Sequence, residues 1–249
     1  MSRLLLLWLA GLAIVLTVAA VGLWTAPRWL VPVIAARSPR CLYTVPTREK
    51  LVALTIDDGP DREDGRVILA VLRENQAHAT FFLISGNVPG AEALVTDVVS
   101  AGHEIGNHLT RDEPSIRLSP TAFVAAMREA GTTLGRFAEI RWLRPGSGWY
   151  NDTMLEAIER EGYRCALGSV YPYDGHGMPA RVSSAYILAN VAPGTVIVLH
   201  EGKGRGRRTA MVLASVLPTL RARGYQVVTL SEMHARSSRG SAGSSPQPP

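Results

Sequence analysis

The sequence predicts an α/β fold in which parallel strands form one sheet and helices lie outside it. Between residues 51 and 230, short apolar runs alternate about seven times with segments of helical spacing, the pattern of repeated strand–helix–strand units. The 249 residues allow one large domain or two small ones, and the shares of hydrophobic (47%) and charged (19%) residues exclude bulk disorder and a coiled coil. An open doubly wound sheet and a closed barrel both fit, and in either the site lies at the carboxyl ends of the strands.

The apolar runs predict the strands. The first, LVALTI at residues 51–56, contains no charged residue and is typical of a buried strand. In chain order the predicted strands are 51–56, 79–84, 103–108, 141–145, 164–170, 194–200 and 225–230.

Helical spacing and capping residues predict the helices between the strands. Residues 64–76 place apolar side chains on one helical face, at Val67, Ile68, Val71 and Leu72. Residues 119–137 begin with a Ser-Pro signal, and residues 152–161 follow an Asn-Asp cap. The predicted helices are 64–76, 91–101, 119–137, 152–161 and 208–223.

An uncharged apolar segment at the N-terminus predicts a transmembrane helix. Residues 4–24 would span roughly 30 Å as a helix, which is enough to cross a bilayer. We interpret residues 1–27 as a signal anchor; a cleaved signal peptide is the alternative, because Val18-Ala19-Ala20 offers a cleavage site. One arginine precedes the segment and three follow it within residues 28–40, so the positive-inside rule does not place the C-terminal domain outside.

The remaining sequence divides into a linker, a domain and a tail. Residues 28–50 hold three prolines and five basic residues and are interpreted as a linker. Residues 51–234 form the predicted α/β domain, and residues 235–249, rich in Ser, Gly and Pro, are predicted to be a disordered tail. The only two cysteines, Cys41 and Cys165, exclude a disulfide-dense scaffold; a disulfide between them and two unrelated thiols are both open.

The net charge of +5 predicts a mild preference of the protein for anionic surfaces such as membranes or cell-wall polymers. Arg236 and Arg239 lie in the polar tail, and four further basic residues form one short loop, Lys203–Arg208, which we expect to be solvated. No nucleic-acid partner is therefore expected.

Reactive side chains follow the predicted strands at the points where the strands end. They are Asp57 and Asp58, His108 with Asp112 four residues later, Arg144, Asp174 and His200. Because the carboxyl ends of parallel strands meet at one edge of a sheet, these side chains map to one place. One of them alone would be read as a turn or hydrogen-bonding residue, but their convergence indicates a catalytic site.

Three of these residues are candidate metal ligands. Asp58, His108 and Asp112 supply nitrogen and oxygen donors in the number that a catalytic zinc site uses while it leaves room for water and substrate. If the segment after His108 turns helically, the i,i+4 spacing places Asp112 on the same face.

The other side chains indicate acid–base chemistry. Asp57 is expected to take the proton of the attacking water as general base, and His200 to protonate the leaving group. A nearby carboxylate, Asp174, would keep His200 protonated and oriented. A backbone N–H of the loop 146–148 would bind the developing oxyanion. Together with a metal, these groups predict hydrolysis of an amide or an ester.

The motif order TIDDGP (55–60), HEIGNH (103–108), RPGSG (144–148), an isolated Asp174 and VLH (198–200) resembles the polysaccharide deacetylases of the NodB-homology type, carbohydrate esterase family 4. The resemblance covers about residues 50–234, and TIDDGP is its most specific motif. It implies a distorted (β/α) barrel with parallel strands and hydrolysis of N-acetyl groups on N-acetylglucosamine-type sugars with a divalent metal, for which we consider zinc, manganese and cobalt.

The resemblance also implies roles for individual residues. It assigns Asp57 as base, Asp58 and His108 as metal ligands, Arg144 as the residue that steadies Asp57, His200 as acid with Asp174 as its partner, and Leu199 as part of the acetyl pocket.

Three positions depart from the family's motifs. Asp112 stands where a histidine is usual, and its harder carboxylate moves the metal preference toward manganese or other hard cations. Ser147 replaces a tyrosine, although its backbone N–H still qualifies as an oxyanion donor. Gly175 follows Asp174 where a tryptophan is usual. The chemistry is therefore expected to be intact, and the substrate stays open.

We expect a membrane-anchored, metal-dependent hydrolase that removes N-acetyl or O-acetyl groups from a carbohydrate polymer or oligosaccharide and does not cleave peptide bonds. Its expected partners are that substrate and the membrane, through residues 4–24. The catalytic domain is expected outside the cytoplasm, where such polymers occur, and cleaved secretion is the alternative. Two rival functions are a catalytically silent glycan-binding barrel and a deacylase of a small N-acyl compound. The presence of both Asp57 and His200 argues against the silent barrel.

Overall fold

The computed structural model describes residues 3–242, in which the strands form one eight-stranded sheet. The strands are β1 (Cys41–Leu42), β2 (Leu51–Gly59), β3 (Ala79–Leu83), β4 (Glu104–Asn107), β5 (Trp142–Leu143), β6 (Arg164–Ala166), β7 (Thr195–His200) and β8 (Gln226–Val228). Their order is β1-β6-β5-β4-β3-β2-β7, and β8 pairs with β2. All pairings between these strands are parallel, so the predicted α/β class is confirmed.

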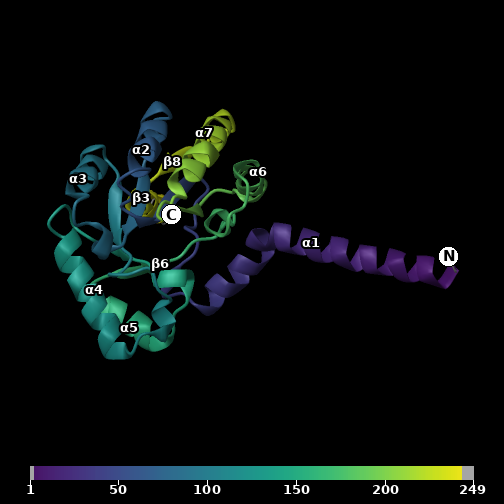
Figure 1. Cartoon of the computed structure of the whole chain (residues 1–249), viewed down its shortest axis with the longest axis horizontal. Coiled ribbons are helices and arrows are strands. Elements are labelled where there is room, and N and C mark those ends of the chain that lie inside the picture. The colour runs from purple at the N-terminus through teal and green to yellow at the C-terminus, as the bar shows by residue number, and fades with distance from the viewer. Residues whose placement is uncertain (1–2, 243–249) are drawn as a thin grey trace, which may run out of the picture.

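Helices α2 to α7 lie around the outside of this sheet, and α1 points away from it (Figure 1). The α-helices are α1 (Arg3–Arg37), α2 (Gly65–Glu74), α3 (Glu92–Ser100), α4 (Pro120–Leu134), α5 (Asp152–Arg160), α6 (Ala180–Asn190), α7 (Gly206–Ala222) and α8 (Leu230–Ala242). Short 3₁₀ turns follow several strands: η1 (Ser85–Asn87), η2 (Ser115–Arg117), η3 (Gly146–Gly148) and η4 (Asp174–His176).

The sheet curls until its two ends meet, which makes it a distorted barrel. Beyond β6, Val170 forms a parallel bridge with Ile197 of β7, and beyond β1, Thr44 forms an antiparallel bridge with Thr195. The backbone N–H of Val198 donates to the carbonyl of Val170 at 3.0 Å. Of the two architectures that the sequence left open, the structure therefore has the barrel.

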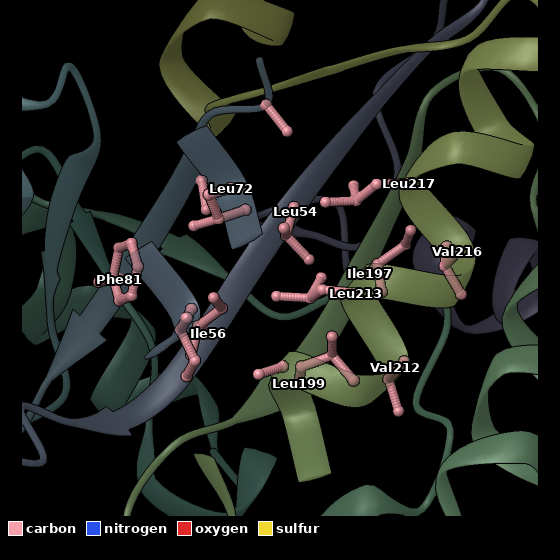
Figure 2. Close-up of a cluster of buried hydrophobic side chains, with 14 of the residues drawn as sticks. Leu54, Ile56, Leu72, Phe81, Ile197, Leu199, Val212, Leu213, Val216 and Leu217 are labelled. Atoms are coloured by element: carbon pink, nitrogen blue, oxygen red, sulfur yellow. The ribbon is translucent and has the colours of Figure 1, made fainter. Parts of the chain in front are cut away.

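One face of the strands packs against the outer helices. Leu54 and Ile56 of β2 lie beside Ile197 and Leu199 of β7 in the largest buried cluster. Figure 2 shows these side chains opposite those of α7, namely Val212, Leu213, Val216 and Leu217. Each such side chain stabilises the fold by about 1.5–3 kcal/mol when it is fully buried, so this layer holds β2 and β7 firmly in place.

The opposite face of the strands fills the barrel interior. This second layer contains Ala53, Phe82, Trp142, Ala166 and Val196, together with Leu230 and Met233 of α8. Because side chains alternate along a strand, Thr55 and Asp57 continue the inward face of Ala53 toward the carboxyl end of β2. The packing of the interior therefore fixes where Asp57 lies.

Most predicted elements are present within a few residues of their expected ends, but β1, α6 and α8 were not predicted. The sequence of α6, ARVSSAYILAN, alternates small, polar and apolar residues without a clear apolar stripe. Its buried residues include two serines and an asparagine, which a periodicity argument does not count as core.

The interpretation of residues 28–50 as a linker is wrong in its first part. Helix α1 continues to Arg37 through Pro27 and Pro32, because an internal proline removes one hydrogen bond and kinks a helix without always ending it. The end of α1, from Trp24 to Arg37, packs on the domain. The ring of Trp24 lies edge-on to Tyr186 at 5.2 Å, and the side chain of Asn190 donates to the carbonyl of Trp24 at 2.9 Å.

The predicted disordered tail, residues 235–249, is also wrong in part. Helix α8 continues to Ala242, and residues 243–249 lie outside the described residues. Arg236 explains the order of this polar segment, because its guanidinium pairs with Glu49 at 2.6 Å and donates to Gln226 at 2.7 Å.

Cys41 and Cys165 form a disulfide. The two residues are register partners in the pairing of β1 with β6, which brings the cysteines together although 124 residues separate them. This resolves the alternative between a disulfide and two unrelated thiols.

The apolar N-terminal segment forms the outer part of α1. The stretch Leu7–Arg37 is long and apolar enough to cross a membrane by length and composition, and its most apolar window is unburied. A signal sequence meets the same criteria.

Candidate active site

The predicted reactive side chains gather at the carboxyl ends of the strands. In the sheet register, Asp57 of β2 lies directly opposite His200 of β7. The last residue of β4 pairs with the last residue of β5, so the residues that follow them, His108 and Arg144, are also neighbours. The structure therefore brings Asp57, His108, Arg144 and His200 to one end of the barrel.

Arg144 is fully buried and holds the carboxylate of Asp57. Its Nη1 donates to Oδ1 of Asp57 in a buried ion pair. The other hydrogen bonds of the guanidinium go to Thr55 Oγ1 at 2.9 Å, the Ala166 carbonyl at 3.0 Å and the Leu167 carbonyl. The ring of Phe82 lies 4.1 Å from the guanidinium carbon. Because so many contacts fix Arg144, the geometry fits its predicted role of steadying Asp57.

His108 and Asp58 form the second pair. Nε2 of His108 lies 3.3 Å from Oδ1 of Asp58, and Nδ1 lies 2.7 Å from the carbonyl of Arg144. Since a carbonyl only accepts, Nδ1 carries a proton and Nε2 faces the carboxylate. With a neutral imidazole, two lone pairs would point at each other, and a proton or a cation between them removes that repulsion.

The contact between His108 and Asp58 shifts the pKa values of both residues. Burial alone would lower the pKa of His108, but the hydrogen bond to Asp58 and the charges of Asp57 and Asp58 raise it. Burial alone would raise the pKa of Asp58, and the hydrogen bond and charge of His108, with the charges of His200 and Arg205, lower it. A divalent cation would replace the shared proton, so the donor atoms of Asp58 and His108 fit such an ion.

The third predicted ligand, Asp112, borders the same cavity as Asp58, but its carboxylate pairs with Nζ of Lys203. Within residues 3–242, no group of three or more His, Cys, Asp or Glu side chains has the arrangement of a metal site. Asp112 as a ligand therefore stays a prediction. The segment after His108 does not turn helically as expected, because residues 110–113 form bends and Leu109 has a φ of 63°.

His200 and Asp174 form the third pair. Nδ1 of His200 lies 3.1 and 3.2 Å from the two carboxylate oxygens of Asp174, and the backbone N–H of His200 donates to the same carboxylate at 2.7 Å. Burial alone would lower the pKa of His200, but the hydrogen bond and charge of Asp174, with the charges of Asp57 and Asp58, raise it. These contacts therefore favour the protonated imidazole, the form in which a general acid acts.

Two further residues were predicted to belong to the site, Ser147 and Leu199. Ser147 is exposed within η3 and has a φ of 60°. Leu199 is fully buried in the cluster against α7 (Figure 2). Because side chains alternate along β7, Leu199 faces away from His200. This placement disagrees with the predicted role of Leu199 in an acetyl pocket. Val198 alternates onto the other face of β7 and lies close to Gly168.

Sequence reasoning missed two residues of the site. Thr55 accepts from Arg144 and donates to the Ile197 carbonyl at 2.8 Å; its position two residues before Asp57 on the same strand face could have indicated it. Glu201 is almost fully buried, and its carboxylate accepts from the backbone N–H of Asp61 at 2.5 Å. Burial, together with nearby acidic charges and despite that hydrogen bond, raises the pKa of Glu201 to about 7.

The basic loop, expected to be solvated, instead contacts the site. Its cations pair in turn with different acceptors: Lys203 with Asp112, Arg205 with Asp58, Arg207 with Asp64, and Arg208 with the Asp174 carbonyl. The run of basic residues was visible in the sequence, but their partners are distant in the chain and only the fold brings them together.

Known proteins share this sequence and fold. Residues 44–166 match a family described as polysaccharide deacetylase. A peptidoglycan-N-acetylglucosamine deacetylase of Bacillus cereus is 31% identical over 194 residues, 77% of this chain and 91% of that protein. The crystal structure of the Bc1960 peptidoglycan N-acetylglucosamine deacetylase aligns with a TM-score of 0.76 and 27% identity over 80% of this chain and 94% of that one. A family 4 acetyl xylan esterase from Clostridium thermocellum, in complex with a cobalt ion, aligns with a TM-score of 0.69 and 29% identity over 75% of this chain and 91% of that one.

Proposed function

This chain belongs to the polysaccharide deacetylase family, and on that premise we propose that it is a metal-dependent hydrolase that removes acetyl groups from N-acetylglucosamine units of a carbohydrate polymer or oligomer. The observation that supports this most is that a carboxylate suited to act as a base and a histidine suited to act as an acid lie opposite each other on the neighbouring strands β2 and β7. Asp57, whose carboxylate pairs with Arg144, and His200, whose imidazole pairs with Asp174, are register partners at the carboxyl end of the strands.

The two groups define a proton path for amide hydrolysis. Arg144 contacts Oδ1 of Asp57, so Oδ2 accepts the proton of the water that attacks the acetyl carbon. Nδ1 of His200 faces Asp174, so Nε2 delivers its proton to the amine nitrogen as the carbon–nitrogen bond breaks. The products are acetate and a free amine on the sugar, and the proton received by Asp57 returns to His200 through solvent.

Asp58 Oδ1 and His108 Nε2 would hold the metal, and Asp112 is the proposed third ligand. When bound, a divalent cation supplies Lewis acidity, which lowers the pKa of water and polarises a carbonyl. We propose zinc, manganese or cobalt, and the acetyl xylan esterase described above is a relative in complex with cobalt.

Helix α1 is proposed to anchor the enzyme in a membrane with the catalytic domain outside the cytoplasm. The support is its apolar, unburied window and a relative named for peptidoglycan, an envelope polymer. Protease treatment of intact cells or spheroplasts tests the topology, and complete protection of the catalytic domain would contradict it.

The substrate is tested by acetate release from chitin oligomers, peptidoglycan and acetylated xylan, each with zinc, manganese, cobalt or EDTA. We expect release from an N-acetylglucosamine substrate that stops when the metal is removed. Binding to these glycans without any acetate release would instead identify a silent glycan-binding barrel. Release from small N-acyl compounds alone would identify the deacylase.

A further inference from the structure

We propose that Arg205 is a positioning residue of the metal site, which holds one carboxylate oxygen of Asp58 so that the other oxygen faces His108. The inference rests on the proposed metal-dependent function and assigns a task to a loop outside the recognised motifs. It concerns how firmly the chain binds its metal, a property that can be measured without turnover.

The two oxygens of Asp58 have different partners. Oδ1 lies 3.3 Å from Nε2 of His108, on the side where the metal would bind. Oδ2 lies 2.7 Å from Nη2 of Arg205. A carboxylate rotates about its terminal bond, so a cation fixed on one oxygen determines where the other oxygen points.

The contact is enclosed. The side chain of Asp58 is 9% exposed and that of Arg205 is 18% exposed, so water screens this pair only weakly. The backbone of Asp58 has a φ of 71°, a left-handed conformation, and its carbonyl accepts from the side chain of Asn87 at 3.1 Å. Asn87 thereby fixes the main chain of Asp58, and Arg205 fixes its side chain.

The loop that carries Arg205 is built against Asp58. Nε of Arg205 donates to the carbonyl of Gly202 at 2.6 Å, which fixes the guanidinium on its own loop. A Cβ atom at Gly202 would lie 2.8 Å from the carbonyl oxygen of Asp58, so only glycine permits this approach. One residue earlier, the N–H of Glu201 donates to the Asp57 carbonyl at 2.9 Å. The loop therefore packs directly against the backbone of Asp57 and Asp58.

The neighbouring cations of the loop differ from Arg205. The side chain of Lys203 is 72% exposed where it meets Asp112, and that of Arg207 is 78% exposed where it meets Asp64. The pair of Lys203 with Asp112 is exposed on both sides and contributes little. The guanidinium of Arg207 lies mostly in solvent although Asp64 is buried, so water screens this pair more than the pair of Arg205 with Asp58. Arg207 thus offers a matched control, because it is an arginine of the same loop paired with an aspartate that is no predicted metal ligand.

The test measures dissociation constants for zinc, manganese and cobalt on the full chain, purified in detergent, by isothermal titration and competition with a chelator. Arg205→Gln should bind the ions about 10–100-fold more weakly than wild type, the range for loss of a group that orients a metal ligand. Arg205→Lys keeps one cationic donor, and its affinity should lie between those of wild type and Arg205→Gln. Arg207→Gln should bind like wild type, and all variants should keep the melting temperature of the wild type within a few degrees.

Unchanged or tighter binding by Arg205→Gln would overturn the proposal; tighter binding would mean that the positive charge of Arg205 repels the metal more than its contact orients Asp58. A lysine variant as weak as the glutamine variant would overturn the claim that a cationic donor at this place orients the carboxylate. A wild-type chain that binds none of the three ions would overturn the proposed metal site itself, together with this inference.

Discussion

Replacing Asp174 with asparagine should move the pH dependence of catalysis in a known direction. The carboxylate of Asp174 lies 3.1 and 3.2 Å from Nδ1 of His200, and it is the largest of the influences that raise the pKa of His200 against the effect of burial. A hydrogen bond to a charged group is worth about 1.5–3 kcal/mol and a neutral one about 0.5–1.5 kcal/mol, so removal of the negative charge should lower the pKa of His200.

The assay is the pH profile of kcat/KM for acetate release. His200 acts as an acid only while it is protonated, so activity is lost as the pH rises through its pKa. In Asp174→Asn the basic limb should therefore lie at lower pH than in wild type, while the acidic limb stays in place. Asp64→Asn is the control, because Asp64 is a buried aspartate that pairs with Arg207 and does not contact His200. A basic limb that stays at the wild-type pH in Asp174→Asn would refute this account of His200.

Other substitutions test the remaining groups. Asp112→Ala should lose most of the bound metal, whereas Asp112→His should keep it with a shift toward zinc; equal metal content in Asp112→Ala and wild type would show that Asp112 is no ligand. His200→Ala should retain metal and lower turnover by about 10²–10⁴-fold, measured at saturating metal and substrate, and a smaller loss would argue against a general acid at this position. Glu201 has a pKa of about 7, above its ordinary value of 4.5, so its protonated form stabilises the fold below pH 4.5 and this contribution is lost as the pH rises through 7. Relative to wild type, Glu201→Gln should therefore gain about 1–3 kcal/mol in free energy of unfolding between about pH 5 and pH 8 in urea titrations, and an equal difference at both pH values would contradict the raised pKa.

The location of the site was predictable because it depends only on where the strands end and on their parallel arrangement. Parallel strands bring their carboxyl ends to one edge, so Asp57, His108, Arg144 and His200 could be placed together from the apolar runs that precede them. Strand periodicity, applied to β7, would have placed Leu199 on the helix side, because it stands one residue before His200 and therefore faces the other way.

Loops were less predictable, because tertiary contacts decide their course. The segment from His108 to Asp112 has helical spacing in the sequence, yet it bends, and Asp112 turns to Lys203 of a loop far along the chain. Pro27 and Pro32 indicated a linker, but packing of α1 on α6 keeps this segment helical. Local sequence does not encode such partners.

Acetate release from N-acetylglucosamine oligomers, measured with and without metal for wild type and Asp57→Asn, tests the central claim most directly. The amide that this substitution introduces cannot accept the proton of water, so the variant should bind metal as wild type does and release no measurable acetate. Wild type should release acetate with metal and stop when EDTA removes it. Acetate release by Asp57→Asn at the wild-type rate, or release by wild type that EDTA leaves unchanged, would contradict the account.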